Sequence, residues 1–296
     1  MQKRPLQQNE KQKKLSGKQF EELNLIDNFL FNTAIDHVQY GKIFAKTILE
    51  TILQRTVRIG RINSERVILP PKPGWHGIRL DAYIEDDTAD LFPGEVYNLE
   101  PDNKKWEKKH LPKRSRFYHS SIDSRLLKAG STYGVLPNTW VIFITSFDPF
   151  NEERMVYTIK NRCMELPDME YEDGAVTLFL NAAGKPLNTP EKMVQLLHFI
   201  CRTVPENACN PDLKVLQECV DDIKQDPLIK EAYMTMGEYV QREREEAAME
   251  EQAKWTKKID VITNERDAAV NERDAALQRI RELEAQLKDL KSRRPI

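Results

Sequence analysis

Two acidic residues lie in neighbouring segments that have the pattern of β-strands. Asp81 belongs to IRLDAYIED (78–86), in which apolar and polar residues alternate, and it falls on the polar side. Glu100 ends the next strand-like segment, EVYNLE (95–100), after a connection rich in Asp, Pro and Gly. Antiparallel neighbours joined in this way can bring two carboxylates within ~5–8 Å, near enough to share one divalent ion. An oxygen-rich cluster of this kind favours Mg²⁺ or Mn²⁺ over zinc.

Asp102 extends this acidic group. It lies two residues after Glu100 and points to the same face if the strand continues. Pro101 between them cannot donate a hydrogen bond to a sheet, so it indicates an edge or a bulge, where strands often aim side chains into sites. Acids on strands are common, and simple solvation at the surface is the alternative interpretation.

A basic segment follows the acids directly. The stretch KKWEKKHLPKRSR (104–116) holds seven Lys or Arg and one acid, and it is interrupted by Trp106 and followed by Phe117 and Tyr118. Carboxylates beside a cationic patch suit phosphodiester cleavage, because the acids hold a metal ion that activates water while the basic groups bind the polyanion. A solvated loop is the alternative. The lysines expected to bind the polyanion are Lys105, Lys108, Lys109 and Lys113.

Other kinds of site lack a signal. Dinucleotide, P-loop and Gly-x-Ser-x-Gly motifs are absent among the 11 glycines. The five histidines show no ligand spacing, and the four cysteines form no Cys-x-x-Cys pair, which favours reduced thiols in a cytoplasm. The net charge of −2 excludes a polybasic protein that acts by bulk electrostatics. Without a secretory signal or an apolar run near the ~20 residues that span a bilayer, we expect a soluble cytoplasmic protein with no membrane partner.

Composition divides the 296 residues into three parts. Residues 1–18 are basic and nearly devoid of apolar side chains, so we expect a disordered leader, with a phosphate-contacting arm as the alternative. Residues 19–235 hold nearly all the aromatic and β-branched side chains and are expected to form one domain. Residues 236–296 are expected to form a long helix.

Helical and strand patterns succeed one another in the central part. Two helical patterns (20–35 and 40–54) come first, and Pro112 opens a later helix that we expect to reach Ala129 before Gly130. The other expected strands are 57–69, 140–147, 156–163 and 176–182, and the other expected helices are 190–203 and 211–226. This order predicts an α/β fold with a mixed sheet flanked by helices.

The last part carries a heptad pattern. NERDAAV (264–270) is followed at once by NERDAAL (271–277), and alternating steps of four and three residues define a stripe. The stripe consists of Trp255, Ile259, Ile262, Arg266, Ala269, Arg273, Ala276, Ile280, Leu283, Leu287 and Leu290. A helix cannot bury a stripe against itself, so homodimerisation through a coiled coil is the simplest use. A solvated single helix held by charge pairs is the alternative.

The central part resembles a known family. The resemblance is carried by IRLDAYIED…VYNLEPD…LPKRSRFYHSSIDSRLLKAGSTYGVLPNTWVIFITSFDPF, together with IDNFLF (26–31), YTIKNRC and DGAVTLFLN. These segments resemble the PD-(D/E)XK nuclease-like family of Rpn-type recombination-promoting nucleases or putative transposases. The likeness covers roughly residues 22–240 and is distributed over many segments.

The resemblance implies a restriction-endonuclease-like core and Mg²⁺- or Mn²⁺-dependent cleavage of DNA. Asp81 matches the motif aspartate and Glu100 matches the acid of the (D/E)-x-K element, so both are expected to hold the metal ion. Asp27 matches an acidic position before a Phe-x-Phe pair and is a candidate auxiliary ligand, with a helix-surface carboxylate as the alternative. The residues that match the basic-aromatic signature of the crossover helix, and are candidates for phosphate contact, are Arg114, Arg116 and Tyr118. Helix packing is the alternative for Tyr118.

The sequence departs from the family at one catalytic position. The family has Lys, or often Gln, where this chain has Asp102, so a group that orients water or stabilises developing charge is replaced by a negative one. Asp102 is then expected to assist as a third acid, with a cation supplied by Lys104 or Arg116. The favoured function is a metal-dependent DNA endonuclease linked to recombination or mobile elements, in which a coiled-coil dimer places two active sites on one duplex. The alternative is a degenerate nuclease fold that acts as a DNA- or protein-binding scaffold.

Overall fold

The computed structural model describes residues 18–68, 78–87 and 94–292. The chain divides into two compact units, of which one ends at Met234 and the other contains the helical segment from Thr235 onward. The expected leader, apart from Lys18, and most of the connection expected between the two acidic strands lie outside the described residues.

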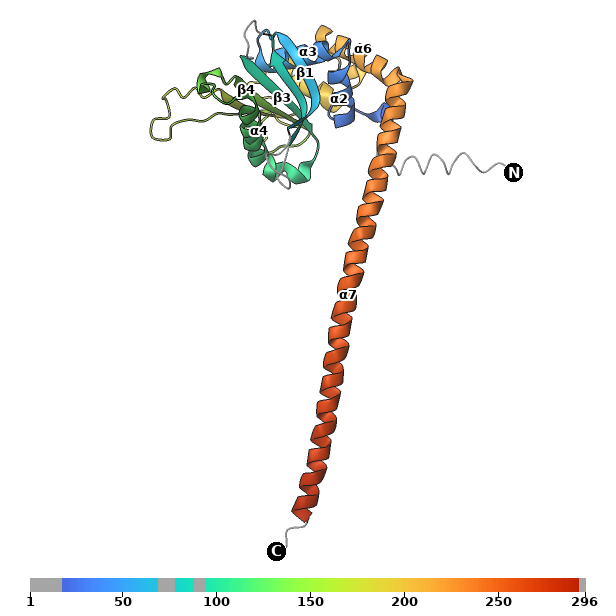
Figure 1. The fold of residues 1–296 in the computed structure, drawn as a ribbon. Coiled ribbons are helices and arrows are strands. Elements are labelled where there is room, and N and C mark those ends of the chain that lie inside the picture. Colours follow the sequence, from blue (N-terminus) through green and yellow to red (C-terminus); the bar gives the residue numbers. More distant parts are fainter. Residues whose placement is uncertain (1–17, 69–77, 88–93, 293–296) are drawn as a thin grey trace, which may run out of the picture. The chain divides into compact units, whose positions relative to one another are not determined.

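A mixed sheet of six strands forms the centre of the first unit (Figure 1). The strands are β1 (Ile59–Ile68), β2 (Ile78–Asp86), β3 (Glu95–Asp102), β4 (Asn138–Thr145), β5 (Val156–Ile159) and β6 (Ala175–Asn181). Their order across the sheet is β1-β2-β3-β4-β6-β5. β3, β4 and β6 run parallel, β2 is antiparallel to both β1 and β3, and β5 is antiparallel to β6. The predicted α/β fold with a mixed sheet is confirmed.

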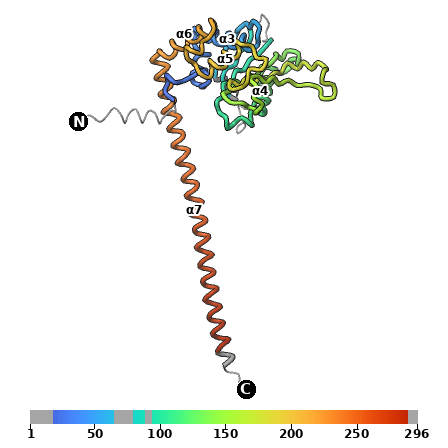
Figure 2. Tube along the Cα trace, turned by 180° about the vertical axis from the view of Figure 1, so that it is seen from behind, coloured from blue at the N-terminus to red at the C-terminus, as the bar shows by residue number. Residues whose placement is uncertain are grey.

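Helices cover both faces of this sheet. The α-helices are α2 (Asn28–Asp36), α3 (Gly41–Leu53), α4 (Leu111–Leu126), α5 (Glu191–Cys201), α6 (Pro211–Gln225) and α7 (Pro227–Ser292). The 3₁₀ turns are η1 (Phe20–Glu22), η2 (Lys105–His110), η3 (Tyr133–Val135) and η4 (Pro205–Asn207). Side chains of α2, α3, α5 and α6 share one hydrophobic core with the sheet, and α4 shares a second core with the opposite face. Figure 2, seen from behind, shows α3, α5 and α6 gathered together, with α4 apart from them.

Strand alternation sorts the residues of β3 between the two cores. Tyr97 and Leu99 belong to the larger core, whereas Val96 belongs to the core under α4. Since successive side chains on a strand point to opposite faces, Glu100 and Asp102 share the face of Val96. The acids therefore lie on the side of the sheet that α4 covers.

β3 continues through Pro101 to Asp102, which is the condition under which Asp102 was expected to share a face with Glu100. The paired positions of β2 and β3 end at Ala82 and Leu99, whereas β4 pairs with β3 as far as Asp102. Pro101 thus lies in an interior strand, but beyond the point where β2 still pairs with it. This local end of the ladder explains how a residue without an N–H donor is tolerated there.

At two places the observed helices differ from those that the sequence predicted. The segment expected to be helical over 20–35 is interrupted between η1 and α2, because Asn24 and Asp27 bond to backbone groups. Asn24 N donates to Asp27 Oδ2 at 2.9 Å, and Thr203 N donates to Asn24 Oδ1 at 2.8 Å. Such bonds compete with the helix. α4 ends at Leu126, three residues before the expected end, because Leu127 is extended, and Gly130 lies in the following turn with φ of 84°.

A single continuous helix forms the described part of the second unit. α7 has 66 residues, which corresponds to a length of about 100 Å. The predicted long C-terminal helix is confirmed. Within the described residues, no helix is long and apolar enough to cross a membrane.

Candidate active site

The two acids of the predicted pair face each other across β2 and β3. Ala82 pairs with Leu99, so the next position of the register sets Asp81 opposite Glu100. Opposed residues of an antiparallel pair point to the same face. The backbone N–H of Asp81 donates to Glu100 Oε1 at 3.0 Å. Beyond the last paired position of β2 and β3, this side chain therefore accepts the hydrogen bond from the backbone of β2. With exposed fractions of 7, 0 and 3%, Asp81, Glu100 and Asp102 are all buried.

Arg114 of α4 bridges two of these acids. Its Nη2 donates to Glu100 Oε2 at 2.7 Å, and its Nη1 donates to Asp102 Oδ2 at 2.6 Å. The guanidinium also lies over the ring of Phe143, 5.2 Å from its centroid, while Nε donates to the Tyr118 hydroxyl at 2.9 Å. Arg114 is therefore part of the acidic site and not of an open phosphate-binding surface in this structure.

Helical spacing explains why Arg114 reaches the acids and Arg116 does not. Leu111, Ser115, Tyr118 and Ile122 are the buried positions of α4, and they recur at every third or fourth residue. Arg114 borders this buried face, whereas Arg116 is exposed. The cation that contacts Asp102 is thus Arg114 in place of the expected Lys104 or Arg116. Tyr118 is 7% exposed, in agreement with its helix-packing alternative.

The electrostatics of the acids reflect their burial. The pKa of Asp81 is raised to about 8, mainly by burial and secondly by the negative charge of Glu100. Burial also raises the pKa of Glu100, although Arg114 and the hydrogen bonds from Asp81 and Asn98 act in the opposite direction. Glu100 has these three donors, whereas Asp81 has one among the described residues, Asn28 Nδ2 at 3.1 Å from Oδ2. Burial therefore favours the protonated form of both Asp81 and Glu100, and hydrogen bonds and Arg114 oppose this effect at Glu100.

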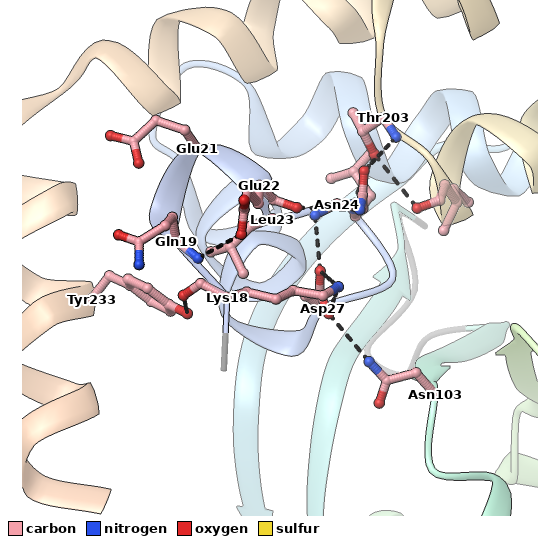
Figure 3. A network of polar contacts seen from close by, with 12 residues as sticks. Lys18, Gln19, Glu21, Glu22, Leu23, Asn24, Asp27, Asn103, Thr203 and Tyr233 are labelled. Atoms are coloured by element: carbon pink, nitrogen blue, oxygen red, sulfur yellow. Dashed lines mark hydrogen bonds and ion pairs between the residues drawn. The ribbon is translucent and has the colours of Figure 1, made fainter. Parts of the chain in front are cut away.

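Asp27 is held by a separate polar network (Figure 3). Lys18 Nζ lies 2.6 Å from its Oδ2, and Asn103 Nδ2 donates to its Oδ1 at 3.2 Å. Asn103 lies between Asp102 and Lys104, so the network reaches the loop that leaves the acidic strand. The network also reaches the beginning of α7, because the Tyr233 hydroxyl donates to the backbone oxygen of Lys18 at 3.1 Å. The carboxylate of Asp27 thus ties segments together in this structure.

The lysines of the predicted basic segment lie on η2 and the start of α4. The exposed cations are Lys104, Lys105, Lys109, Lys113 and Arg116, and Lys108 is half-buried and donates to Asn151 Oδ1 at 2.6 Å. Lys104 is close enough for its charge to act on Asp81, and its backbone N–H donates to Asp102 Oδ1 at 2.7 Å. Trp106 is 73% exposed and Phe117 is 42% exposed. This part of the surface therefore combines positive charge with open aromatic rings beside the acids.

Carboxylate oxygens are the ligand type that hard divalent cations prefer. Three buried carboxylates are offset by one guanidinium, which contacts Glu100 and Asp102. The pKa of Asp81 is raised first by burial and then by the charge of Glu100. Within the described residues, no three His, Cys, Asp or Glu side chains are arranged to hold a metal ion. Mg²⁺ needs only one or two protein carboxylates, with water and substrate phosphate completing its shell. Asp81 and Glu100 supply two carboxylates, but both oxygens of Glu100 already accept hydrogen bonds in this structure, Oε1 from Asp81 N and Asn98 Nδ2 and Oε2 from Arg114.

Two asparagines of the site were not among the predicted residues. Asn98 Nδ2 donates to Glu100 Oε1 at 3.0 Å, and Asn28 contacts Asp81 from α2. Strand alternation could have found Asn98, because it lies two residues before Glu100 on the same face. The contact of Asn28 joins residues 53 positions apart, and no local pattern predicts it.

The structure is thus an α/β fold in which a buried acidic cluster lies where the pairing of β2 and β3 ends. A scan against protein-family models and searches of the curated proteins and of the solved structures found no match to this chain.

Proposed function

We propose that this protein is a metal-dependent DNA endonuclease of restriction-endonuclease-like fold, similar to Rpn-type nucleases and linked to recombination or mobile elements. The observation that carries the proposal is the register that sets Asp81 opposite Glu100 on one face, with Asp102 on the same face. Asp81 and Glu100 are the residues that would hold Mg²⁺ or Mn²⁺. When bound, the metal ion supplies activation of water and neutralisation of charge on the phosphate.

The chain's own residues have separate tasks in this proposal. Arg114 holds Glu100 and Asp102 in place and supplies the positive charge that the family's Lys position lacks here. Lys104, whose charge acts on Asp81, lies where it can stabilise negative charge on a phosphate. The exposed lysines of η2 and α4 bind the DNA backbone, which gives affinity without sequence preference.

The scaffold alternative is favoured by the two ion pairs of Arg114. Arg114 already satisfies one oxygen of Glu100 and one of Asp102, as a structural ion pair would do in a fold that binds DNA without cutting it. In that case the buried acids position α4, and the basic surface alone carries the function.

A plasmid-nicking assay separates the two functions. Purified protein is incubated with supercoiled plasmid and Mg²⁺ or Mn²⁺, beside Asp81→Asn, Glu100→Gln and the exposed control Asp212→Asn. Nicking by the parent and the control, and by neither site variant, supports the endonuclease, provided that thermal unfolding shows both site variants to be folded. Retained DNA binding without nicking by the parent supports the scaffold.

A further inference from the structure

The stripe of α7 has no partner within its own unit. Among the described residues, α7 is the sole element of that unit. Ile259, Ile262 and Leu283 are 58, 55 and 47% exposed. Apolar side chains repeated at heptad spacing along an exposed helix indicate an interface with another helix.

We propose that α7 pairs with α7 of a second copy of this chain in antiparallel orientation, centred on Asn271. Turning one helix end for end about this residue sets every stripe position from Trp255 to Leu287 opposite another stripe position. Large apolar residues of the two copies then face each other in three different pairs, each of which occurs twice by symmetry. These pairs are Trp255 opposite Leu287, Ile259 opposite Leu283, and Ile262 opposite Ile280 of the second copy.

The two arginines of the stripe select this orientation. In a parallel pair in register, equal positions face each other, so Arg266 would meet Arg266 and Arg273 would meet Arg273. In the antiparallel pair, Arg266 meets Ala276 and Arg273 meets Ala269 of the second copy. A small alanine leaves room for the arginine stem, whose guanidinium can extend to water. The repeated NERDAA sequence thus removes two layers of like charge.

Charges beside the stripe agree with this arrangement. Glu265 of one helix lies next to Arg279 of the second copy, and the symmetry makes this pair twice. In the single chain, Arg279 contacts Glu282 at 3.2 Å in an exposed ion pair, which contributes little and can be exchanged. Glu272 meets its own copy near the centre, where the neighbouring Arg273 side chains offset the repulsion.

Cross-linking of the native full-length chain tests the orientation. Lys258 and Lys288 are about 45 Å apart along one helix, beyond the reach of a short amine-reactive reagent. In the antiparallel dimer, Lys258 of one copy and Lys288 of the other are offset by only about 6 Å along the axis. Mass spectrometry of a mixture of ¹⁴N- and ¹⁵N-labelled chains should therefore find a Lys258–Lys288 link between copies. Links of Lys258 to Lys258 and of Lys288 to Lys288, or a monomer at micromolar concentration, would overturn the proposal.

A charge exchange provides a second test. Glu265→Arg and Arg279→Glu should each weaken the dimer at least about fivefold by sedimentation equilibrium, and the double variant should recover most of the loss. In a parallel pair the same residues face Val270 and Glu284, so the double variant would not recover. Lys257→Glu, on the outward side of the paired helix, is the control and should leave the dissociation constant unchanged. Neither test depends on nuclease activity, so the failure of one proposal leaves the other intact.

Discussion

Arg114 pairs with Glu100 across the two layers of the fold, with Nη2 2.7 Å from Oε2. The glutamate is fully buried and reaches this position from β3, whereas the arginine comes from α4. Since the same guanidinium also contacts Asp102, one cation from the helix offsets part of a cluster of acids on the sheet. The stability and the proposed chemistry of the site both depend on this cation.

Removal of Arg114 should therefore destabilise the protein. Arg114→Ala leaves Glu100 and Asp102 buried without their cation, and we expect a loss of ~3 kcal/mol in the free energy of unfolding. Mg²⁺ should restore part of the loss, because it binds the folded state. Thermal unfolding with EDTA and with Mg²⁺ measures both effects.

Arg116→Ala is the matched control on the same helix. Because Arg116 is exposed, its removal should change the free energy of unfolding by less than ~0.5 kcal/mol, with no response to Mg²⁺ beyond that of the parent. Equal effects of the two substitutions would contradict the role of Arg114.

Stability without metal should fall as pH rises from about 4 to about 8. The pKa of Asp81 is about 8 in the folded chain and ~3.9 in an unfolded one, so between these values the folded state binds the extra proton. Unfolding then releases a proton, which makes the free energy of unfolding decrease with pH. Asp81→Asn should flatten the curve and stabilise the metal-free protein at pH 8 by ~2 kcal/mol. Asp212→Asn, an exposed site, should reproduce the parent's curve, and a parent curve that rises over this window would refute the assignment.

DNA binding should depend on the exposed lysines of η2 and α4. Alanine at Lys105, Lys109 and Lys113 should lower affinity for any duplex sequence and reduce the slope of log K against log salt by up to ~2.7, if each lysine contacts one phosphate. Fluorescence anisotropy at several salt concentrations measures this slope. Lys214→Ala, which removes an exposed lysine of α6, should leave the slope unchanged.

Trp106 should favour DNA with unpaired bases. Its ring is 73% exposed among lysines, and stacking of one base on an aromatic ring contributes ~1–3 kcal/mol. Trp106→Ala should weaken binding to an oligonucleotide with an unpaired stretch about tenfold, with little effect on a blunt duplex. Tyr133, at 81% exposure but outside the basic segment, supplies the control substitution Tyr133→Ala. A uniform loss across both DNAs would show that Trp106 acts only through the fold of η2.

Local patterns predicted the strands of the site better than the helices around it. The alternation of IRLDAYIED and EVYNLE located β2 and β3, and the shared face of Glu100 and Asp102 follows from a repeat of two residues. The helix expected over 20–35 was wrong in its first half, because the partner of Asn24 is Thr203, which lies far along the chain.

The sequence by itself determined that Glu100 and Asp102 share a face and which positions of the long helix form its apolar stripe, because strand and heptad periods are properties of neighbouring residues. Only the tertiary structure decided that Arg114 is the cation that reaches Glu100, and that Asp27 is tied to Lys18 and Asn103. Those contacts depend on how α4 and the N-terminal segment pack against the sheet. Packing brings together groups whose separation along the chain carries no periodic signal.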